Sequence, residues 1–300
     1  MKLAGMGEDA LVAALLRGLP DGPEVIRGPG DDCAVIGAPR AKTWRLLKTD
    51  CVIETVHFLP GENPRRIGWK ALARAISDIA AMGGRPEHAL VTLALPGSET
   101  LKRATGIYAG LRQCAKAYGV TIVGGETARS PGPLFLSIAL TGSVERRHCV
   151  FRSGGMPGDL LFVTGRLGGS IKGRHLTFRP RVEQAQWLAG HLRVHAMMDL
   201  SDGLGTDLPR LALASGCGCH IEPSALPLHA GCTAKQALSD GEDYELLFAI
   251  PPRDATRLRT LWSRKFPSLR LTEIGALTPL SPLPPGPRRA GARHGYDHFA

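Results

Sequence analysis

Strand-like and helix-like apolar patterns alternate along most of the chain, and this alternation constrains the fold more than any other feature. The clearest helix is predicted over residues 63–83, where Asn63 can act as a cap, Pro64 takes the first helical position and a double glycine follows a periodic apolar face. A strand-like run at 88–95 precedes a second predicted helix at about 98–118, and strands at 120–123 and 134–144 follow it. The pattern predicts a mixed α/β fold.

A charged turn, ERRH, divides the chain into two such units near residue 150. After it, strand-like runs recur at 160–165, 196–200, 219–223, 244–250 and 269–277, and helical patterns at about 182–192, 206–215 and 253–265. A length of 300 residues with 43% hydrophobic side chains suits two domains with real cores. We expect the domains to span residues 1–149 and 150–300.

The net charge of +10 does not indicate a nucleic-acid binder. Residues 251–300 hold nine Lys or Arg and three Asp or Glu, so six of the ten charges lie there, and only 5% of the chain is aromatic. The seven cysteines form no CxxC pair, which favours a reducing cytoplasm. The first residues lack the order of a signal peptide, and no run reaches the roughly 18 apolar residues of a membrane span.

Carboxylates recur beside glycine or inside apolar runs, where solvent-seeking side chains are not expected by chance. They are Asp31, Asp32, Asp50, Asp78, Glu126, Asp199 and Asp202. Burying an ionised carboxylate costs several kcal/mol unless it is paired or binds a metal ion. Because the ligands are hard oxygens and no Cys/His ligand set accompanies them, the pattern indicates a magnesium cluster rather than a zinc site.

Four of these carboxylates also have an ordinary structural interpretation. Asp78 follows Arg74 by four residues, so a surface ion pair on the helix would account for it, although the last helical turn disfavours an anion. Asp31, Asp32 and Asp202 adjoin glycine and suit turns. Their joint occurrence favours the metal cluster.

Nucleotide phosphates would suit such a cluster, although GxxxxGK[ST], a dinucleotide-binding G-x-G-x-x-G and the protein-kinase motifs are absent from the sequence. Two glycine-rich segments, 152–159 and 163–170, would present backbone N–H groups to phosphate, or serve as turns between strands. Arg152 can bind phosphate with two hydrogen bonds or form an exposed salt bridge. His57 follows an apolar strand and either contacts substrate or simply packs.

The whole set of motifs resembles one family. GDDCAVI, KTDCVIETVHF, AISDIAAMGG, IVGGETARS, FRSGGMPGD, DLSDGLGTDL, SDGEDYEL and GYDHF occur in the order found in thiamine-monophosphate kinases, within the aminoimidazole ribonucleotide synthetase-like superfamily. The resemblance implies a two-domain synthetase-like fold, with an N-terminal mixed sheet that forms a barrel-like dimer interface. It implies ATP-dependent phosphorylation of thiamine monophosphate to thiamine diphosphate, in a cleft between the domains of a cytoplasmic homodimer that needs neither nucleic acid nor membrane.

The resemblance also implies roles for individual residues. Those similar to magnesium ligands are Asp32, Thr49, Asp50, Asp78, Glu126, Asp199 and Asp202. Those similar to ATP contacts are Tyr108, Gly125, Glu126, Arg152 and Ser201. Those similar to thiamine-site residues are His57, Glu242 and Tyr296. Among all of these, Asp50, Asp78 and Arg152 are the expected catalytic residues.

Three features depart from the family pattern. Lys48 stands where a small hydroxyl residue is usual, Glu126 replaces Asp or Asn, and the stretch from Gly165 to His175 is short. Two alternatives therefore accompany the kinase hypothesis: an ATP-dependent superfamily enzyme with another acceptor, and a noncatalytic nucleotide-binding paralogue.

Overall fold

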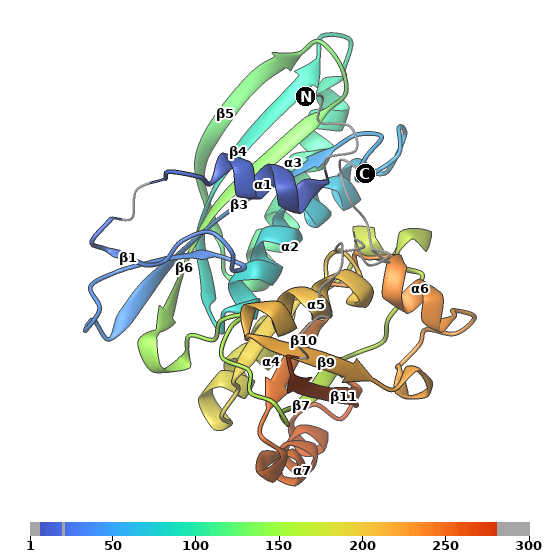
Figure 1. Ribbon diagram of the computed structural model, residues 1–300. Helices are drawn as coiled ribbons and strands as arrows, with labels where there is room; N and C mark the ends of the chain where they lie inside the picture. Colours follow the sequence, from blue (N-terminus) through green and yellow to red (C-terminus); the bar gives the residue numbers. More distant parts are fainter. Residues whose placement is uncertain (1–6, 20–21, 281–300) are drawn as a thin grey trace.

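The computed structural model describes residues 7–19 and 22–280, which form two α/β units, one above the other in Figure 1. The first unit contains α1 (Glu8–Leu15), β1 (Val25–Arg27), β2 (Ala34–Ile36), β3 (Thr43–Ile53), α2 (Pro64–Ala81), β4 (Arg85–Pro96), α3 (Leu101–Tyr118), β5 (Thr121–Ser130), β6 (Phe135–Glu145) and the 3-10 turn η1 (Arg146–His148). The second contains β7 (Leu160–Thr164), η2 (Ser170–Lys172), η3 (Arg174–Leu176), α4 (Val182–His191), β8 (Ala196–Asp199), α5 (Leu204–Ala214), β9 (Cys217–Ile221), η4 (Pro223–Ala225), α6 (Ala234–Ser239), β10 (Leu246–Ile250), η5 (Pro252–Asp254), α7 (Ala255–Lys265) and β11 (Leu271–Pro279).

The first unit is built on a six-stranded mixed sheet in the order β1-β2-β3-β6-β4-β5, in which only the β4–β5 pair is parallel among the described strands. Leu46, Val91 and Ile138 alternate toward the face that packs on α2 and are fully buried. The opposite face is open, and Leu47 on β3 and Leu90 on β4 are 38% and 49% exposed there.

Helix α2 forms as the sequence predicts and connects the two units. The Asn63 side chain accepts a hydrogen bond from the Arg65 N–H, and Pro64 begins the helix, because its missing donor is not needed in the first turn. The helix packs on β3 and α3 in its own unit and on α4 and β8 in the second. Contact with elements on several sides explains why most of its residues, Asp78 included, are buried.

The second unit has three layers around a five-stranded antiparallel sheet, β8-β10-β7-β11-β9. One face packs on α5 and α6 through residues such as Val163 and Leu208, and the other packs on α4 and α7 through Phe248 and Trp262. This arrangement confirms the mixed α/β, two-domain fold. Strand β5 extends well beyond the predicted residues 120–123, and the short α6 was not predicted.

Candidate active site

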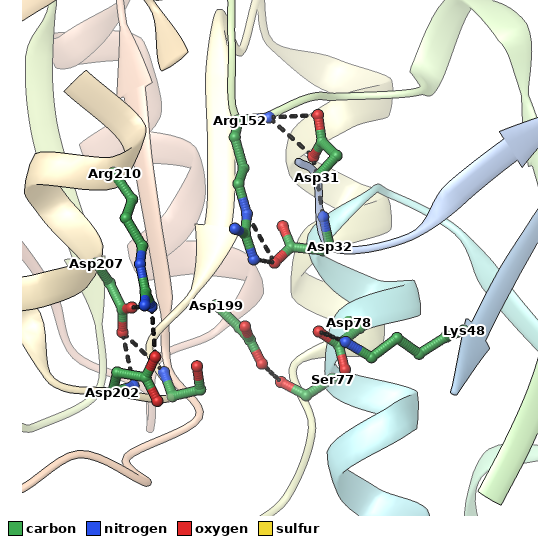
Figure 2. A network of polar contacts seen from close by, with 11 residues as sticks. Asp31, Asp32, Lys48, Ser77, Asp78, Arg152, Asp199, Asp202, Asp207 and Arg210 are labelled. Carbon is green, nitrogen blue, oxygen red and sulfur yellow. Dashed lines mark hydrogen bonds and ion pairs between the residues drawn. The ribbon is translucent and has the colours of Figure 1, made fainter. Parts of the chain in front are cut away.

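Three carboxylates from distant parts of the chain meet where the two units join. Asp32 precedes β2, Asp78 lies in the last turn of α2 and Asp199 ends β8. One oxygen of each lies within 4.8 Å of the others, and all three residues are buried (Figure 2). The structure thus brings together three of the residues that the sequence predicts as metal ligands.

Basic and hydroxyl groups contact this cluster, but they leave one of its carboxylate oxygens without a hydrogen-bond partner in the described part of the chain. Arg152 Nη2 and Nε donate to Asp32 Oδ1 at 2.5 and 3.1 Å, and Lys48 Nζ lies 2.9 Å from Asp78 Oδ1. Ser77 Oγ donates to Asp199 Oδ2 at 2.5 Å. Asp32 Oδ2 is buried and has no hydrogen-bond partner among residues 7–19 and 22–280. A buried carboxylate oxygen without a partner in these ranges, on a residue within reach of two other carboxylates, fits a site for a divalent cation.

The electrostatics of the cluster support this interpretation. Burial and the neighbouring Asp32 raise the pKa of Asp199 to about 7, and burial raises the pKa of Asp78 well above its ordinary range despite Lys48. The basic side chains around the cluster therefore supply too little positive charge to keep these carboxylates ionised. The donors that face one another are oxygens, which suits magnesium.

Asp50 lies on the same face of β3 as Lys48, and it pairs with Arg74. Arg74 Nε donates to Asp50 Oδ2 at 3.1 Å, whereas Asp50 Oδ1 accepts the Cys51 N–H. The structural alternative for Asp78, a surface ion pair with Arg74, is therefore wrong, because Arg74 pairs with Asp50 and Asp78 is buried in the cluster.

The loop after β8 is held by two residues that the sequence analysis missed. Asp207, fully buried near the start of α5, accepts the backbone N–H groups of Ser201 and Asp202 at 2.9 Å each. Arg210, one turn later, pairs with both Asp202 and Asp207 (Figure 2). The available signal was an acidic residue on the apolar face of a predicted helix, in the TDL of DLSDGLGTDL. These contacts fix the loop beside the cluster.

The predicted thiamine-site residues His57 and Glu242 come together through a third missed residue, Lys70. Lys70 is fully buried in α2, and its Nζ donates to the His57 carbonyl and to Glu242 Oε2, at 2.6 Å in both cases. Glu242 has a φ of 54°, so the backbone holds it in a conformation uncommon for a residue with a side chain. A lysine inside the apolar face of the 63–83 helix was the signal for this contact.

Other predicted residues lie outside the cluster. Alternation along β3 directs Thr49 to the exposed face, opposite Lys48 and Asp50. Gly125 and Glu126 are exposed on β5, which is three strands away from β3 in the sheet order, and Tyr108 packs against the first core from α3. Their roles stay predictions. Tyr296 lies outside the described residues.

Comparisons with known proteins agree with this geometry. Residues 30–144 match the family described as AIR synthase related protein, N-terminal domain, and residues 156–279 match its C-terminal domain. Thiamine-monophosphate kinase of Rhodopirellula baltica is 42% identical over 250 residues, which cover 78% of each chain. The chain belongs to the thiamine-monophosphate kinase family. The Haemophilus influenzae enzyme of this name is 36% identical and covers 77% of each chain.

Among solved structures, the similarity covers the whole chain. A structure described as AaThiL complexed with AMPPCP and TMP has a TM-score of 0.82 and 30% identity, and covers 100% of this chain and 99% of that one. Hydrogenase maturation protein HypE of Escherichia coli, at 21% identity and a TM-score of 0.66, shares the fold alone. The alternative hypotheses, another acceptor or a noncatalytic role, are not favoured by these matches.

Proposed function

We propose that this protein transfers the γ-phosphoryl group of ATP to the phosphate of thiamine monophosphate, giving thiamine diphosphate and ADP. The observation that carries the proposal is the buried cluster of Asp32, Asp78 and Asp199, in a chain whose curated relatives are thiamine-monophosphate kinases. In the transfer, an oxygen of the acceptor phosphate forms a bond to the γ-phosphorus, and the bond from that phosphorus to the ADP oxygen breaks.

Magnesium is the proposed metal, held by Asp32, Asp78 and Asp199, with Asp50 and Asp202 close by. When bound, it would neutralise phosphate charge and align the attacking and leaving oxygens. The oxygen donor set and the orphaned Asp32 oxygen support this assignment. Thr49 and Glu126 remain proposed ligands from the resemblance.

The chain's own residues have mainly to position two polyanions and offset their repulsion. The second pKa of a phosphate monoester is near 6, so the acceptor is already a dianion at neutral pH and needs no strong base. Arg152 stands at the start of a glycine-rich loop, with its guanidinium held over the cluster by Asp32. From there it can stabilise charge on the transferred phosphoryl group, with Ser201 and Gly125 as further nucleotide contacts.

The acceptor is proposed to bind between His57 and Glu242, which Lys70 holds together across the two units. Tyr296 would complete this site by stacking on the cationic ring or the pyrimidine.

We also propose a cytoplasmic homodimer. The open face of the first sheet carries Leu47 and Leu90, and Val123 is 55% exposed on β5, an apolar combination that suits a second copy of the chain. Light scattering should give twice the chain mass of 32.0 kDa. Among the helices that the structure describes, none is long and apolar enough to cross a membrane.

The experiment that tests the proposed function measures ADP release in a coupled assay with ATP and Mg²⁺. Release should require thiamine monophosphate, should not occur with thiamine alone and should stop when a chelator removes the metal. ADP release that is equally fast without thiamine monophosphate would overturn the proposed acceptor.

A further inference from the structure

The Arg74 guanidinium of α2 has an N–H group without a hydrogen-bond partner among the described residues. Its Nε donates to Asp50 Oδ2, but its Nη1 is buried and finds no partner within the part of the chain that the structure describes. The side chain is 14% exposed. An unmet N–H of a buried guanidinium is costly to the folded protein, so its persistence indicates a group that a bound ligand satisfies.

Tyr244 has a second donor that no described residue satisfies, and it lines one cavity together with Arg74. Its residue is 3% exposed, and its hydroxyl also has no partner among the described residues. Its ring stacks on Phe178 with centroids 3.8 Å apart, which fixes the direction of the hydroxyl. Burial raises the pKa of Tyr244 well above its ordinary value, so the hydroxyl keeps its proton and can donate.

The cavity that Arg74 and Tyr244 line also contains carboxylates, but each of these already has a partner. Glu242 accepts from Lys70, Asp202 pairs with Arg210, and Asp240 accepts the Gly169 N–H at 2.7 Å. The lining residues with a buried polar atom that no described residue satisfies are Arg74 and Tyr244, and both atoms can donate. Donors without a local acceptor, one of them a guanidinium, select an oxyanion.

The position of the cavity indicates which oxyanion binds there. His57, Glu242, Val56 and Ile171 line one part of it, and Ser201 and Asp202 line another. It thus lies between the proposed thiamine residues and the loop proposed to contact ATP. Arg74 also lies one helical turn before Asp78, so an anion bound to it lies next to the carboxylate cluster.

We propose that Arg74 and Tyr244 bind the phosphate of the acceptor, with Arg74 a substrate-binding residue that distinguishes thiamine monophosphate from thiamine. This inference rests on the proposed function. It gives Arg74 two partners at once: Asp50 orients the guanidinium through Nε, and Nη1 reaches the phosphate. A planar fork can do both, whereas a lysine ammonium cannot reproduce this geometry.

The test is calorimetric titration of the full chain, in Mg²⁺, with thiamine monophosphate and separately with thiamine. In the unaltered protein, the phosphate should strengthen binding. Arg74→Met should reduce the ratio of the two affinities about 10- to 100-fold, and Tyr244→Phe about tenfold, because hydrogen bonds to a charged group are lost. Arg74→Lys, which keeps the charge, should recover only part of the ratio, and affinity for an ATP analogue should not change.

Arg66→Met is the matched control. Arg66 is on the same helix but its side chain is 53% exposed, and it pairs only at 3.9 Å with Glu62. Melting temperatures of all variants show whether they remain folded. An unchanged affinity ratio in folded Arg74→Lys and Tyr244→Phe, or equal weakening for thiamine and its phosphate, would overturn this inference alone. An unaltered protein that binds neither compound would overturn the proposed function and this inference together.

Discussion

Lys48 places a fixed positive charge at a position where the resemblance to the family implies a small hydroxyl residue. Burial lowers the pKa of its ammonium, but Asp78 and Asp50 more than offset this and hold the pKa above its ordinary value, so the group stays charged. Its Nζ lies 2.9 Å from Asp78 Oδ1. A tethered ammonium at that distance competes with a metal ion for the same carboxylate.

We therefore expect Lys48→Ser to bind one more divalent ion per chain than the unaltered protein. The measurement is the number of Mn²⁺ ions bound in the presence of a nonhydrolysable ATP analogue, counted from the free-ion signal in electron paramagnetic resonance. Lys42→Ser, at an exposed position near the same strand, is the control and should not change the number. An equal count in Lys48→Ser would show that the ammonium does not replace a cation.

Asp78 faces Asp32, Asp199 and Lys48 together, so its charge contributes directly to the cluster. Asp78→Asn should lower turnover at least about 100-fold, since the loss of a metal ligand removes several kcal/mol of transition-state stabilisation. The melting temperature without metal should fall, because the mutation removes the partner of the buried Lys48 ammonium, so turnover is compared well below that temperature. Glu183→Gln, an exposed ion-pair partner of Lys265, is the control. Full activity in Asp78→Asn would remove this residue from the site.

Among the helices and strands, the bounds of α2 were predicted almost completely, whereas those of β5 were not. The predicted helix, 63–83, contains its own signals, a cap, a proline and a double glycine, and the observed helix is Pro64–Ala81. Beyond residue 123, strand β5 passes through Gly124 and Gly125, which have low strand propensity. It continues as a strand because it pairs with β4 up to Ser130, and no local sequence pattern reports a pairing partner.

The contact between α2 and α3 depends on two glycines. A Cβ on Gly68 would lie 2.0 Å from the Ile107 carbonyl oxygen, and a Cβ on Gly110 would lie 1.9 Å from that of Arg65. The backbones of the two helices therefore touch. This contact sets the position of α2, and with it the positions of Arg74 and Asp78.

Gly68→Ala should destabilise the protein by about 1–3 kcal/mol, since overpacking outweighs the gain in helix propensity of about 1 kcal/mol. Gly190→Ala in α4 meets no atom within 4 Å, so it should have the opposite sign and stabilise by up to about 1 kcal/mol. Urea denaturation monitored by circular dichroism measures both changes. A Gly68→Ala variant as stable as the unaltered protein would show that the helices can separate at little cost.

In the molecule as a whole, the sequence predicted the carboxylate cluster but not the residues that hold the surrounding segments in place. Asp32, Asp78 and Asp199 stand out because they are acidic residues in apolar or glycine-rich settings, a local property. Lys70 acts through Glu242, which is 172 residues away, and Arg74 through Asp50, which is 24 residues away, whereas the partners of Asp207 lie in its own loop and helix. The packing of the two units brings Lys70 to Glu242, and the packing of α2 on β3 brings Arg74 to Asp50, so spacing along the sequence does not reveal these two pairs.

The stability of the metal-free protein should decrease as the pH rises. Burial raises the pKa of Asp31 to about 6 and those of Asp199, Asp207 and Asp243 to about 7, from an ordinary value of 3.8. Between about pH 4 and pH 7, the folded chain keeps protons that the unfolded chain has released, so stability falls as the pH rises through this window.

Scanning calorimetry with a chelator should therefore give a lower melting temperature at pH 8 than at pH 5. Adding Mg²⁺ should raise the melting temperature more at pH 8, where the carboxylates are ionised. Asp199→Asn should reduce the pH dependence. A melting temperature in chelator that rises between pH 5 and pH 8 would contradict these assignments.

Chromatography of the products tests whether the protein phosphorylates thiamine monophosphate with ATP. Purified protein is mixed with ATP, Mg²⁺ and thiamine monophosphate, alongside mixtures that each lack one component. We expect thiamine diphosphate and ADP in equal amounts, in the complete mixture alone. ATP binding without thiamine diphosphate in the complete mixture would contradict the account and leave only the fold and the nucleotide site.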